Sequence, residues 1–211
     1  MLKRPPPARS PRRAAGFTLI ELMTVLVLMA ILLMLAMPSF TTWVRNSKLR
    51  TVGDSLQNGL RLAQAEAMRR NRQVVFTLTN DKVIASNAAS HTAVNNGNHW
   101  ALTTVKAYAN DAFAFIESGV LTDVAAGVKV TGPAAICFNA MGRIVDNNEP
   151  GISGADCELP TTTPAVTTYN ISYADAVTGV DRPMRVTVAL GGQVRMCDPA
   201  KTLNASNPDG C

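Results

Sequence analysis

The chain has 211 residues, of which 47% are hydrophobic and 17% are charged, and its formal net charge is +5. The whole excess lies in residues 1–16, which hold five basic residues and no acidic one, so the rest of the chain has 15 of each. This balance excludes a protein that binds nucleic acid through a global positive field, and any such binding would need a local basic patch. Residues 73–211 hold 8 basic and 12 acidic residues and suffice for one domain core.

The first segment is basic and rich in proline, and a long apolar segment follows it. Residues 1–16 contain four prolines, which disfavour a helix, and their charges suit a segment at the cytoplasmic face of a membrane. From Leu22 to Met37 every residue except Thr24 is apolar. As a helix, residues 17–40 rise about 36 Å, which is enough to cross a hydrocarbon core of roughly 30 Å.

Two ordinary explanations of this segment fit less well. A secretory signal peptide places small residues after its apolar run, whereas here Ala14, Ala15 and Gly16 come before it. A plain single-pass anchor explains the apolar run and the basic flank but not Glu21. A carboxylate inside a membrane segment costs on the order of 2–3 kcal/mol and usually marks a function or a specific partner.

The stretch GFTLIELMTVLVLMAILLMLAMPSF, residues 16–40, resembles the N-terminus of type IV pilins and type II secretion pseudopilins. The resemblance implies that a prepilin peptidase cuts between Gly16 and Phe17 and that the new N-terminus at Phe17 is methylated. Glu21 then becomes the fifth residue of the mature chain and is expected to pair with the free amine of a neighbouring subunit. Pro38 falls where members of the family carry a helix-bending proline.

The same resemblance implies a domain organisation and a location. Residues 1–16 are the cleaved leader, and residues 17–40 form the transmembrane and filament-core helix. The protein is expected in the inner membrane as a single-pass protein with a periplasmic head, and then in a pilus or pseudopilus filament. Its expected partners are other pilins or pseudopilins, the prepilin peptidase and the inner membrane.

Residues 41–72 have the pattern of an amphipathic helix that continues into the head. Their apolar residues recur at steps of three to five and form one stripe, as in a helix that lies on a domain. The stripe consists of Val44, Leu49, Val52, Leu56, Leu60, Ala63 and Ala67.

After residue 72 the pattern changes to short strands. Residues 73–78 and 82–85 flank Asn80-Asp81 and are predicted to form a hairpin. Further short strands are expected at Trp100–Lys106, Ala112–Glu117, Val128–Thr131, Ala135–Asn139, Arg143–Asp146, Tyr169–Tyr173, Arg185–Leu190 and Gln193–Met196. One helix followed only by short strands predicts an α+β, pilin-like fold, in which a long N-terminal helix packs on a small antiparallel β-sheet head.

Residues 86–98 are rich in Ser, Asn, Ala, His and Gly and are predicted to form a surface loop. His91 and His99, the chain's two histidines, are expected to be exposed to solvent there. No partner with metal-ligand spacing accompanies them. The sequence also lacks Ser/His/Asp, phosphate-loop and paired metal-carboxylate patterns. We therefore expect no enzymatic activity, no metal and no cofactor.

The four cysteines, Cys137, Cys157, Cys197 and Cys211, fit no zinc or redox spacing. An even number on the trans side of a membrane indicates structural disulfides, for which three connectivities exist. Pairing Cys137 with Cys157, and Cys197 with Cys211, is favoured because each bridge closes a segment rich in Pro, Gly, Asn and Asp. The second bridge would tie down a C-terminal tail that has few apolar residues.

The head narrows the resemblance to the FimT/GspH group of minor pilins and pseudopilins. The segments RRNRQVVFTL, AICFNAMGRI and GGQVRMCDP with the final cysteine are similar to that group. Some FimT-like proteins bind DNA through a Gly-Arg-x-Arg tail and serve natural transformation. Here Gln193 stands in place of the first arginine of that stretch.

A basic patch near the tail is the candidate contact for double-stranded DNA. It consists of Arg182, Arg185, Arg195 and Lys201, with Asp198 as the one acid between residues 182 and 201. Such a patch would contact phosphates without reading the base sequence. The alternative is that Arg185 and Arg195 are charges on the exposed face of edge strands, which protect against edge pairing.

Three functions follow from the sequence. The first is a minor pilin that helps to initiate or decorate a type IV pilus, and the second adds non-specific DNA binding by the tail during natural transformation. The third is a minor pseudopilin of type II secretion, similar to GspH, with a role in protein export.

Overall fold

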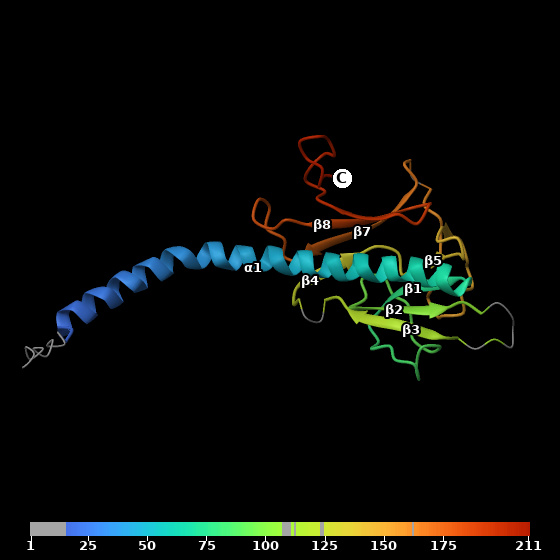
Figure 1. Ribbon diagram of the computed structural model, residues 1–211, viewed down its shortest axis with the longest axis horizontal. Coiled ribbons are helices and arrows are strands. Elements are labelled where there is room, and N and C mark those ends of the chain that lie inside the picture. The colour runs from blue at the N-terminus through green and yellow to red at the C-terminus, as the bar shows by residue number, and fades with distance from the viewer. Residues whose placement is uncertain (1–15, 107–110, 112, 123–124, 162) are drawn as a thin grey trace, which may run out of the picture. The chain divides into compact units, whose positions relative to one another are not determined.

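The computed structural model describes residues 16–106, 111, 113–122, 125–161 and 163–211. Apart from Gly16, the predicted leader lies outside the described residues. The chain divides after Thr41 into an N-terminal segment and a head that begins at Thr42. The helix α1, Leu19–Arg70, supplies the N-terminal segment and also the helix of the head (Figure 1).

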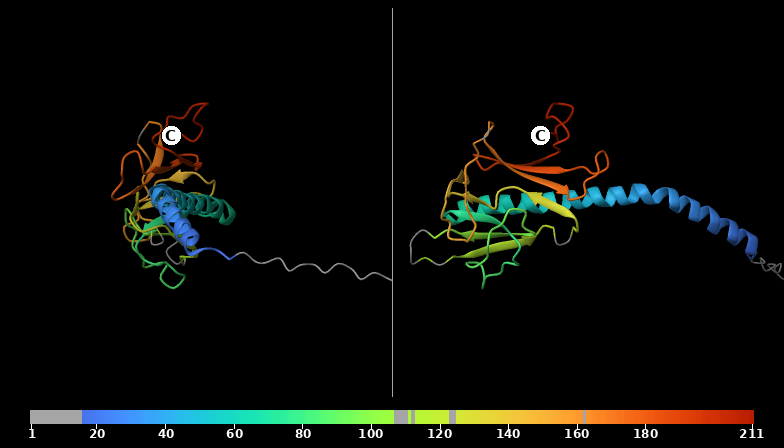
Figure 2. Two further views of the ribbon diagram at one scale, coloured as in Figure 1. Left: turned by 90° about the vertical axis from the view of Figure 1, so that its left-hand side faces the viewer. Right: turned by 180° about the vertical axis from the view of Figure 1, so that it is seen from behind.

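The head consists of the second part of α1 and two antiparallel sheets. The first sheet has the order β3-β2-β1-β5-β6 and the second has the order β4-β7-β8-β9. The first sheet contains β1 (Val74–Thr79), β2 (His99–Thr104), β3 (Phe115–Val120), β5 (Ala135–Phe138) and β6 (Ile144–Val145). The second contains β4 (Val128–Thr131), β7 (Val166–Tyr173), β8 (Met184–Ala189) and β9 (Val194–Cys197). Within the head, the helix lies between β7 and β8 on one side and β1 to β3 on the other (Figures 1 and 2).

One stripe of α1 forms the centre of the core. Its buried residues are Leu49, Val52, Gly53, Leu56, Gly59, Leu60, Ala63 and Ala67. The predicted stripe is thus confirmed from residue 49 onward, while Val44 is half-buried. The two glycines let neighbouring side chains approach the helix backbone. A Cβ on Gly59, for example, would lie 3.0 Å from the ring of Trp100.

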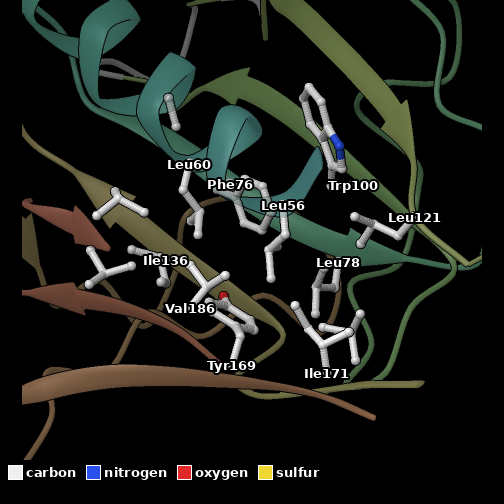
Figure 3. Packing of buried hydrophobic residues seen from close by; sticks show 14 of the residues in the cluster. Leu56, Leu60, Phe76, Leu78, Trp100, Leu121, Ile136, Tyr169, Ile171 and Val186 are labelled. Carbon is white, nitrogen blue, oxygen red and sulfur yellow. The ribbon is translucent and has the colours of Figure 1, made fainter. Parts of the chain in front are cut away.

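The two sheets meet each other beside this stripe. Phe76 of β1 and Tyr169 of β7 are fully buried, and their rings lie edge to face with centroids 6.3 Å apart. Figure 3 shows Leu56 and Leu60 of α1 in the same cluster, with Val186 from the second sheet. Full burial of such side chains contributes about 1.5–3 kcal/mol each, so this cluster supplies much of the stability of the head.

A second, smaller core covers the opposite face of the first sheet. It contains Val75, Ala93, Val105, Ala135, Cys137, Ile152, Ala155 and Cys157. The long loops bring residues 93 and 152–157 onto the sheet, and the disulfide Cys137–Cys157, with an S–S distance of 2.12 Å, lies among them. All six residues of β1 are buried as a result.

The predicted hairpin of residues 73–78 with 82–85 is wrong. β1 forms as expected, but it pairs with β2 on one edge and with β5 on the other. Both edges of β1 are therefore occupied, and residues 82–85 have no edge to join. After β1 the chain turns at Asp81, whose backbone N–H donates to the hydroxyl of Thr79 at 3.1 Å, and then leaves the sheet.

The other strand predictions are confirmed with small shifts at their ends. β4 has the predicted bounds, while β3 begins and ends three residues later than expected. The observed bounds of β3 differ from the predicted ones because its pairing with β2 determines where it begins and ends. The pairing of β2 with β3 has a register shift between Leu102 and Thr103.

The predicted exposure of both histidines is wrong, although residues 86–98 form a loop with many exposed residues, as expected. His91 is 2% exposed and His99, the first residue of β2, is 9% exposed. The carbonyl of Ala88 accepts a hydrogen bond from Nδ1 of His91 at 2.8 Å, so Nε2 of the neutral ring accepts from the hydroxyl of Thr77 at 2.9 Å. The polar loop is thus folded onto β1, because Thr77 offers a hydroxyl where an apolar residue would offer no partner.

Two turns and the helix meet at one junction between the sheets. The turn before β6 ends at Gly142, whose carbonyl accepts a hydrogen bond from the side chain of Gln64 at 3.0 Å. The turn between β8 and β9 places Gly192 directly against that carbonyl. The N–H of Ile144 donates to the carbonyl of Leu190 at 3.2 Å and links the two turns. The sequence segments AICFNAMGRI and GGQVR therefore meet in space.

Gly192→Ala is expected to destabilise the head strongly. Gly192 has φ +83°, and an added Cβ would overlap the Gly142 carbonyl oxygen. The left-handed conformation alone costs a non-glycine residue roughly 1–2 kcal/mol, and the overlap adds to that cost. The measurement is urea unfolding of the detergent-solubilised protein. Gly191→Ala is the matched control, since a Cβ there meets nothing within 4 Å, and equal stability of the two variants would contradict this account.

The head is expected to lose stability as the pH falls below about 6.5, the ordinary pKa of histidine. Burial lowers the pKa of His91, because it disfavours the charged imidazolium. Below pH 6.5 the unfolded chain therefore binds a proton that the folded chain resists, so the free energy of unfolding falls. His91→Gln should flatten this part of the profile in unfolding experiments between about pH 5 and 7.5. An unchanged profile would show that other groups cause it.

Candidate assembly and tail sites

The start of α1 is built around Thr18 and Glu21. The Thr18 hydroxyl accepts a hydrogen bond from the backbone N–H of Glu21 at 3.3 Å, and the Thr18 carbonyl accepts from Leu22 at 3.2 Å. Thr18 is thus the N-cap of the helix and Glu21 is its third residue, the order of a capping box. A carboxylate here also suits the positive end of the helix dipole. The local fold places Glu21 one turn from Phe17.

The N-terminal part of α1 is apolar on all sides. Every large apolar side chain between residues 17 and 40 is between 52% and 85% exposed. The most apolar window of the helix has a mean hydropathy of 2.7, and none of it is buried in the structure. By length and composition this segment can cross a membrane. Because water would penalise each such side chain by about 1.5–3 kcal/mol, the segment needs lipid or the apolar helices of partners.

Pro38 lies inside α1, and the helix is continuous through it. Proline has no N–H to donate to the preceding turn, which weakens the helix locally. The hydroxyl of Thr41 donates to the carbonyl of Pro38 at 2.9 Å. That Pro38 bends the helix stays a prediction.

The loop between β7 and β8 is fastened to the first turns of the helix in the head. Arg45 donates two hydrogen bonds of 2.8 Å to the carboxylate of Asp181, and it lies 3.5 Å from Asp175. Its guanidinium also stacks over the ring of Tyr173 at 4.0 Å from the centroid. These hydrogen bonds from Arg45 lower the pKa of Asp181. The loop is thereby held at residues that follow closely on the apolar segment.

The C-terminal tail forms a closed loop that stands on the side of β8 away from α1 (Figure 1). The disulfide Cys197–Cys211 ties its two ends, with an S–S distance of 2.09 Å. Arg195 of β9 donates hydrogen bonds to the carbonyls of Pro208 at 2.9 Å and Gly210 at 2.8 Å. Both favoured disulfides are therefore present, and the guanidinium of Arg195 acts as a clamp on the tail.

The tail also brings an acid to the predicted basic patch. Lys201 is 2.5 Å from Asp209 and 3.8 Å from Asp198. The hydrogen bond from Lys201 lowers the pKa of Asp209. Counted with Asp198 and Asp209, the four predicted basic residues therefore carry a net charge of +2 instead of +3.

The structure separates the four basic residues into different surroundings. Arg185 and Arg195 share the face of the second sheet that points away from the core, and Arg185 donates to the side chain of Asn170 at 2.8 Å. Lys201 lies within the tail. Arg182 lines a groove beside the helix, together with Trp43 and Arg50. That the four residues together form a DNA-binding patch stays a prediction.

Sequence reasoning missed Lys129 on the same outer face. In β4 the residues alternate between buried and exposed, with Val128 and Val130 buried and Lys129 exposed. β4 pairs with β7, and β7 pairs with β8, so the face runs from Lys129 across to Arg185. The alternation Val-Lys-Val-Thr was the available signal. The outer face thus offers Lys129, Arg185 and Arg195, with threonine, serine and asparagine side chains between them.

Metal-binding geometry is not found in the described part of the chain. There, no group of three or more His, Cys, Asp or Glu side chains could hold a metal ion.

Comparisons with family models agree with the sequence resemblance. Residues 11–37 match the prokaryotic N-terminal methylation motif, and residues 53–192 match the family described as type II transport protein GspH. A comparison with curated proteins found no match to this chain.

Solved structures with some similarity are minor pilins and pseudopilins. The type IV minor pilin FimU of Pseudomonas aeruginosa strain PAO1 is 16% identical, with 75% of this chain and 95% of that chain covered and a TM-score of 0.49. The minor pseudopilin EpsH from the type 2 secretion system of Vibrio cholerae is 13% identical, with 73% of this chain and 99% of that chain covered and a TM-score of 0.42.

The family assignment rests on the matched models, which span the processing motif and most of the head. The GspH model alone covers 140 of the 211 residues, from position 53 to position 192. The N-terminal methylation motif covers the predicted cleavage position and the apolar run. The chain therefore belongs to the GspH family of type IV pilin-like proteins, the minor pilins and pseudopilins of type IV pili and type II secretion systems.

Proposed function

We propose that this protein is a minor pilin of a type IV pilus. In this proposal the prepilin peptidase removes residues 1–16 and residues 17–40 hold the subunit in the inner membrane. The head lies in the periplasm until the subunit enters the filament. The observation that carries it is the exposed apolar segment that begins with a capped helix at Thr18 and Glu21. Disulfides in the head suit an oxidising compartment.

We propose that the carboxylate of Glu21 forms an ion pair with the free N-terminal amine at Phe17 of the neighbouring subunit. Among apolar helices an unpaired carboxylate is costly, and a close opposite charge offsets that cost. Because the interaction is strong only over a short distance, it selects one axial position of a subunit against its neighbour. Glu21 also lies at the third position of the capped helix. A variant that removes its whole side chain would therefore affect both charge pairing and helix capping.

Glu21→Gln separates charge pairing from helix capping. Glutamine can fill the same place in a capping box but carries no charge. The variant should be cleaved and inserted into the membrane normally, while its incorporation into filaments should fall at least about tenfold, the effect of losing about 1.4 kcal/mol. The measurement is the amount of the protein in sheared filaments relative to membranes.

Glu21→Asp serves as the control, since it keeps the charge one methylene shorter. We expect partial incorporation of this variant. Wild-type incorporation of Glu21→Gln would show that the charge is not needed and would remove this role of Glu21.

The alternative is a minor pseudopilin of type II secretion, which the description of the matched family favours. Both functions use the same N-terminal segment, so Glu21 does not distinguish them. Deletion of the gene distinguishes them directly. Loss of twitching motility or transformation supports the pilus, and accumulation of exoproteins in the periplasm supports secretion.

Non-specific binding of double-stranded DNA is a second candidate function, and the outer face of the second sheet favours it. Lys129, Arg185 and Arg195 lie on this face among neutral polar side chains. Phosphates need such basic contacts and no base-specific ones. Arg195 is a poor residue with which to test it, because its loss would also release the tail from Pro208 and Gly210.

The double variant Lys129→Gln/Arg185→Gln should weaken DNA binding and leave the tail intact. The measurement is the affinity of the mature protein in detergent for a short duplex over a range of salt concentrations. Each lost phosphate contact lowers the slope of log affinity against log salt by about 0.9, so the slope should fall by roughly 2. Lys82→Gln/Lys106→Gln, which removes two exposed charges elsewhere on the head, is the control. Equal binding by both variants, or none by the wild type at low salt, would reject this function.

A further inference from the structure

A groove beside the first turns of the helix in the head combines an aromatic side chain with two cations. It is lined by Trp43, Asn46, Ser47, Arg50, Arg182 and Met184. Its volume is about 250 Å³, which is enough for a small polar group. Trp43 is 66% exposed, and Arg50 and Arg182 are exposed as well.

The two sides of the groove are held together by hydrogen bonds. The side chain of Asn46 donates to the carbonyl of Val180 at 3.1 Å and accepts from the backbone N–H of Arg182 at 2.8 Å. Arg50 comes from the helix and Arg182 from the loop before β8, so residues far apart in the sequence are fixed at one place. The loop is further held by the pair of Arg45 and Asp181. The groove is thus a built feature of the head and not a chance meeting of mobile side chains.

The charges around the groove leave its two arginines available. Arg45 faces the same loop, but it is paired with Asp181 and Asp175. The pKa of Asp209 is lowered mainly by Lys201, with which it is paired, and to a smaller extent by the charge of Arg50. In the part of the chain that the structure describes, no carboxylate forms an ion pair with Arg50 or Arg182. The groove therefore has the charge to receive an anion.

The position of the groove in the chain indicates which anion it meets. Trp43 follows the apolar segment by three residues, because that segment ends at Phe40. Tryptophan is enriched at the level of lipid headgroups, where its ring is half in apolar surroundings and its N–H is hydrated. Arginine binds phosphate oxygens through paired N–H donors, and basic pockets beside membrane helices bind anionic headgroups.

We infer that this groove binds the phosphate headgroup of an anionic phospholipid of the membrane that holds residues 17–40. Arg50 and Arg182 contact the phosphate, and the ring of Trp43 lies against the glycerol and the first part of the acyl chains. The bound lipid fixes the depth and rotation of the head at the membrane before assembly. This inference rests on the membrane anchoring in the proposed function and assigns Arg182 a role other than DNA binding.

The test is lipid selectivity of the full mature chain by native mass spectrometry. The protein in non-ionic detergent is mixed with equal amounts of phosphatidylglycerol and phosphatidylcholine that have the same acyl chains. The wild type should retain more phosphatidylglycerol, and Arg50→Gln/Arg182→Gln should lower this enrichment by roughly fivefold or more, since one basic side chain near anionic lipid contributes about that factor. Lys82→Gln/Lys106→Gln should keep it.

Several outcomes would overturn the inference. They are equal retention of the two lipids by the wild type, unchanged enrichment in the double variant, and displacement of phosphatidylglycerol by millimolar inorganic phosphate. If the double variant loses filament incorporation but keeps its lipid selectivity, the groove contacts another subunit instead. Extraction of membranes at high pH tests anchoring separately, so failure of the proposed function is distinguishable from failure of the lipid site. Thermal unfolding of both variants shows whether the head is intact.

Discussion

Burial of one helical stripe between two sheets is the interaction on which the rest of the head depends. Leu56 and Leu60 are fully buried against residues of both sheets. Without the helix, the inner faces of both sheets would lose the apolar stripe that buries them. The helix that carries the apolar N-terminal segment is therefore also the central core element of the head.

The two parts of this helix differ in their surroundings, and the residue pattern follows that difference. Before Pro38 the side chains are apolar on all sides, as in a segment that lipid or other helices surround. From Leu49 onward one stripe is apolar and the remainder is polar, since the remainder meets water. The few residues between these parts carry Trp43 and Arg45, whose side chains combine an apolar body with a polar group.

Polar contacts decide the details that hydrophobic burial leaves open. Gln64 joins the helix to the turn at Gly142, and Arg195 clamps the tail through backbone carbonyls. His91 joins a polar loop to β1 through Thr77. A basic residue near the end of the chain therefore has a structural function here, and counting charges along the sequence overstates the surface that is available to a ligand. Lys129, by contrast, is exposed on β4.

Much of the fold could be predicted because its signals are local. The processing motif at Gly16 and Phe17, the apolar run, the stripe after residue 48 and most strands depend on neighbouring residues, whose period of 3.6 or 2 shows in the sequence. The disulfides were also within reach, since each closes a short loop. The sequence alone thus determined the family, the α+β fold and the two different halves of the helix.

Only the tertiary structure decided which segments meet. β1 pairs with β2 and β5, and so the predicted hairpin had no edge on which to form. Asp209 returns to Lys201 because the disulfide closes the tail, and Arg182 lies beside Arg50 because the loop before β8 is bound to Asn46. These outcomes depend on contacts between residues that are tens of positions apart. A pattern of neighbouring residues carries no information about them, which is why the positions of the cations and the histidines emerged only from the folded chain.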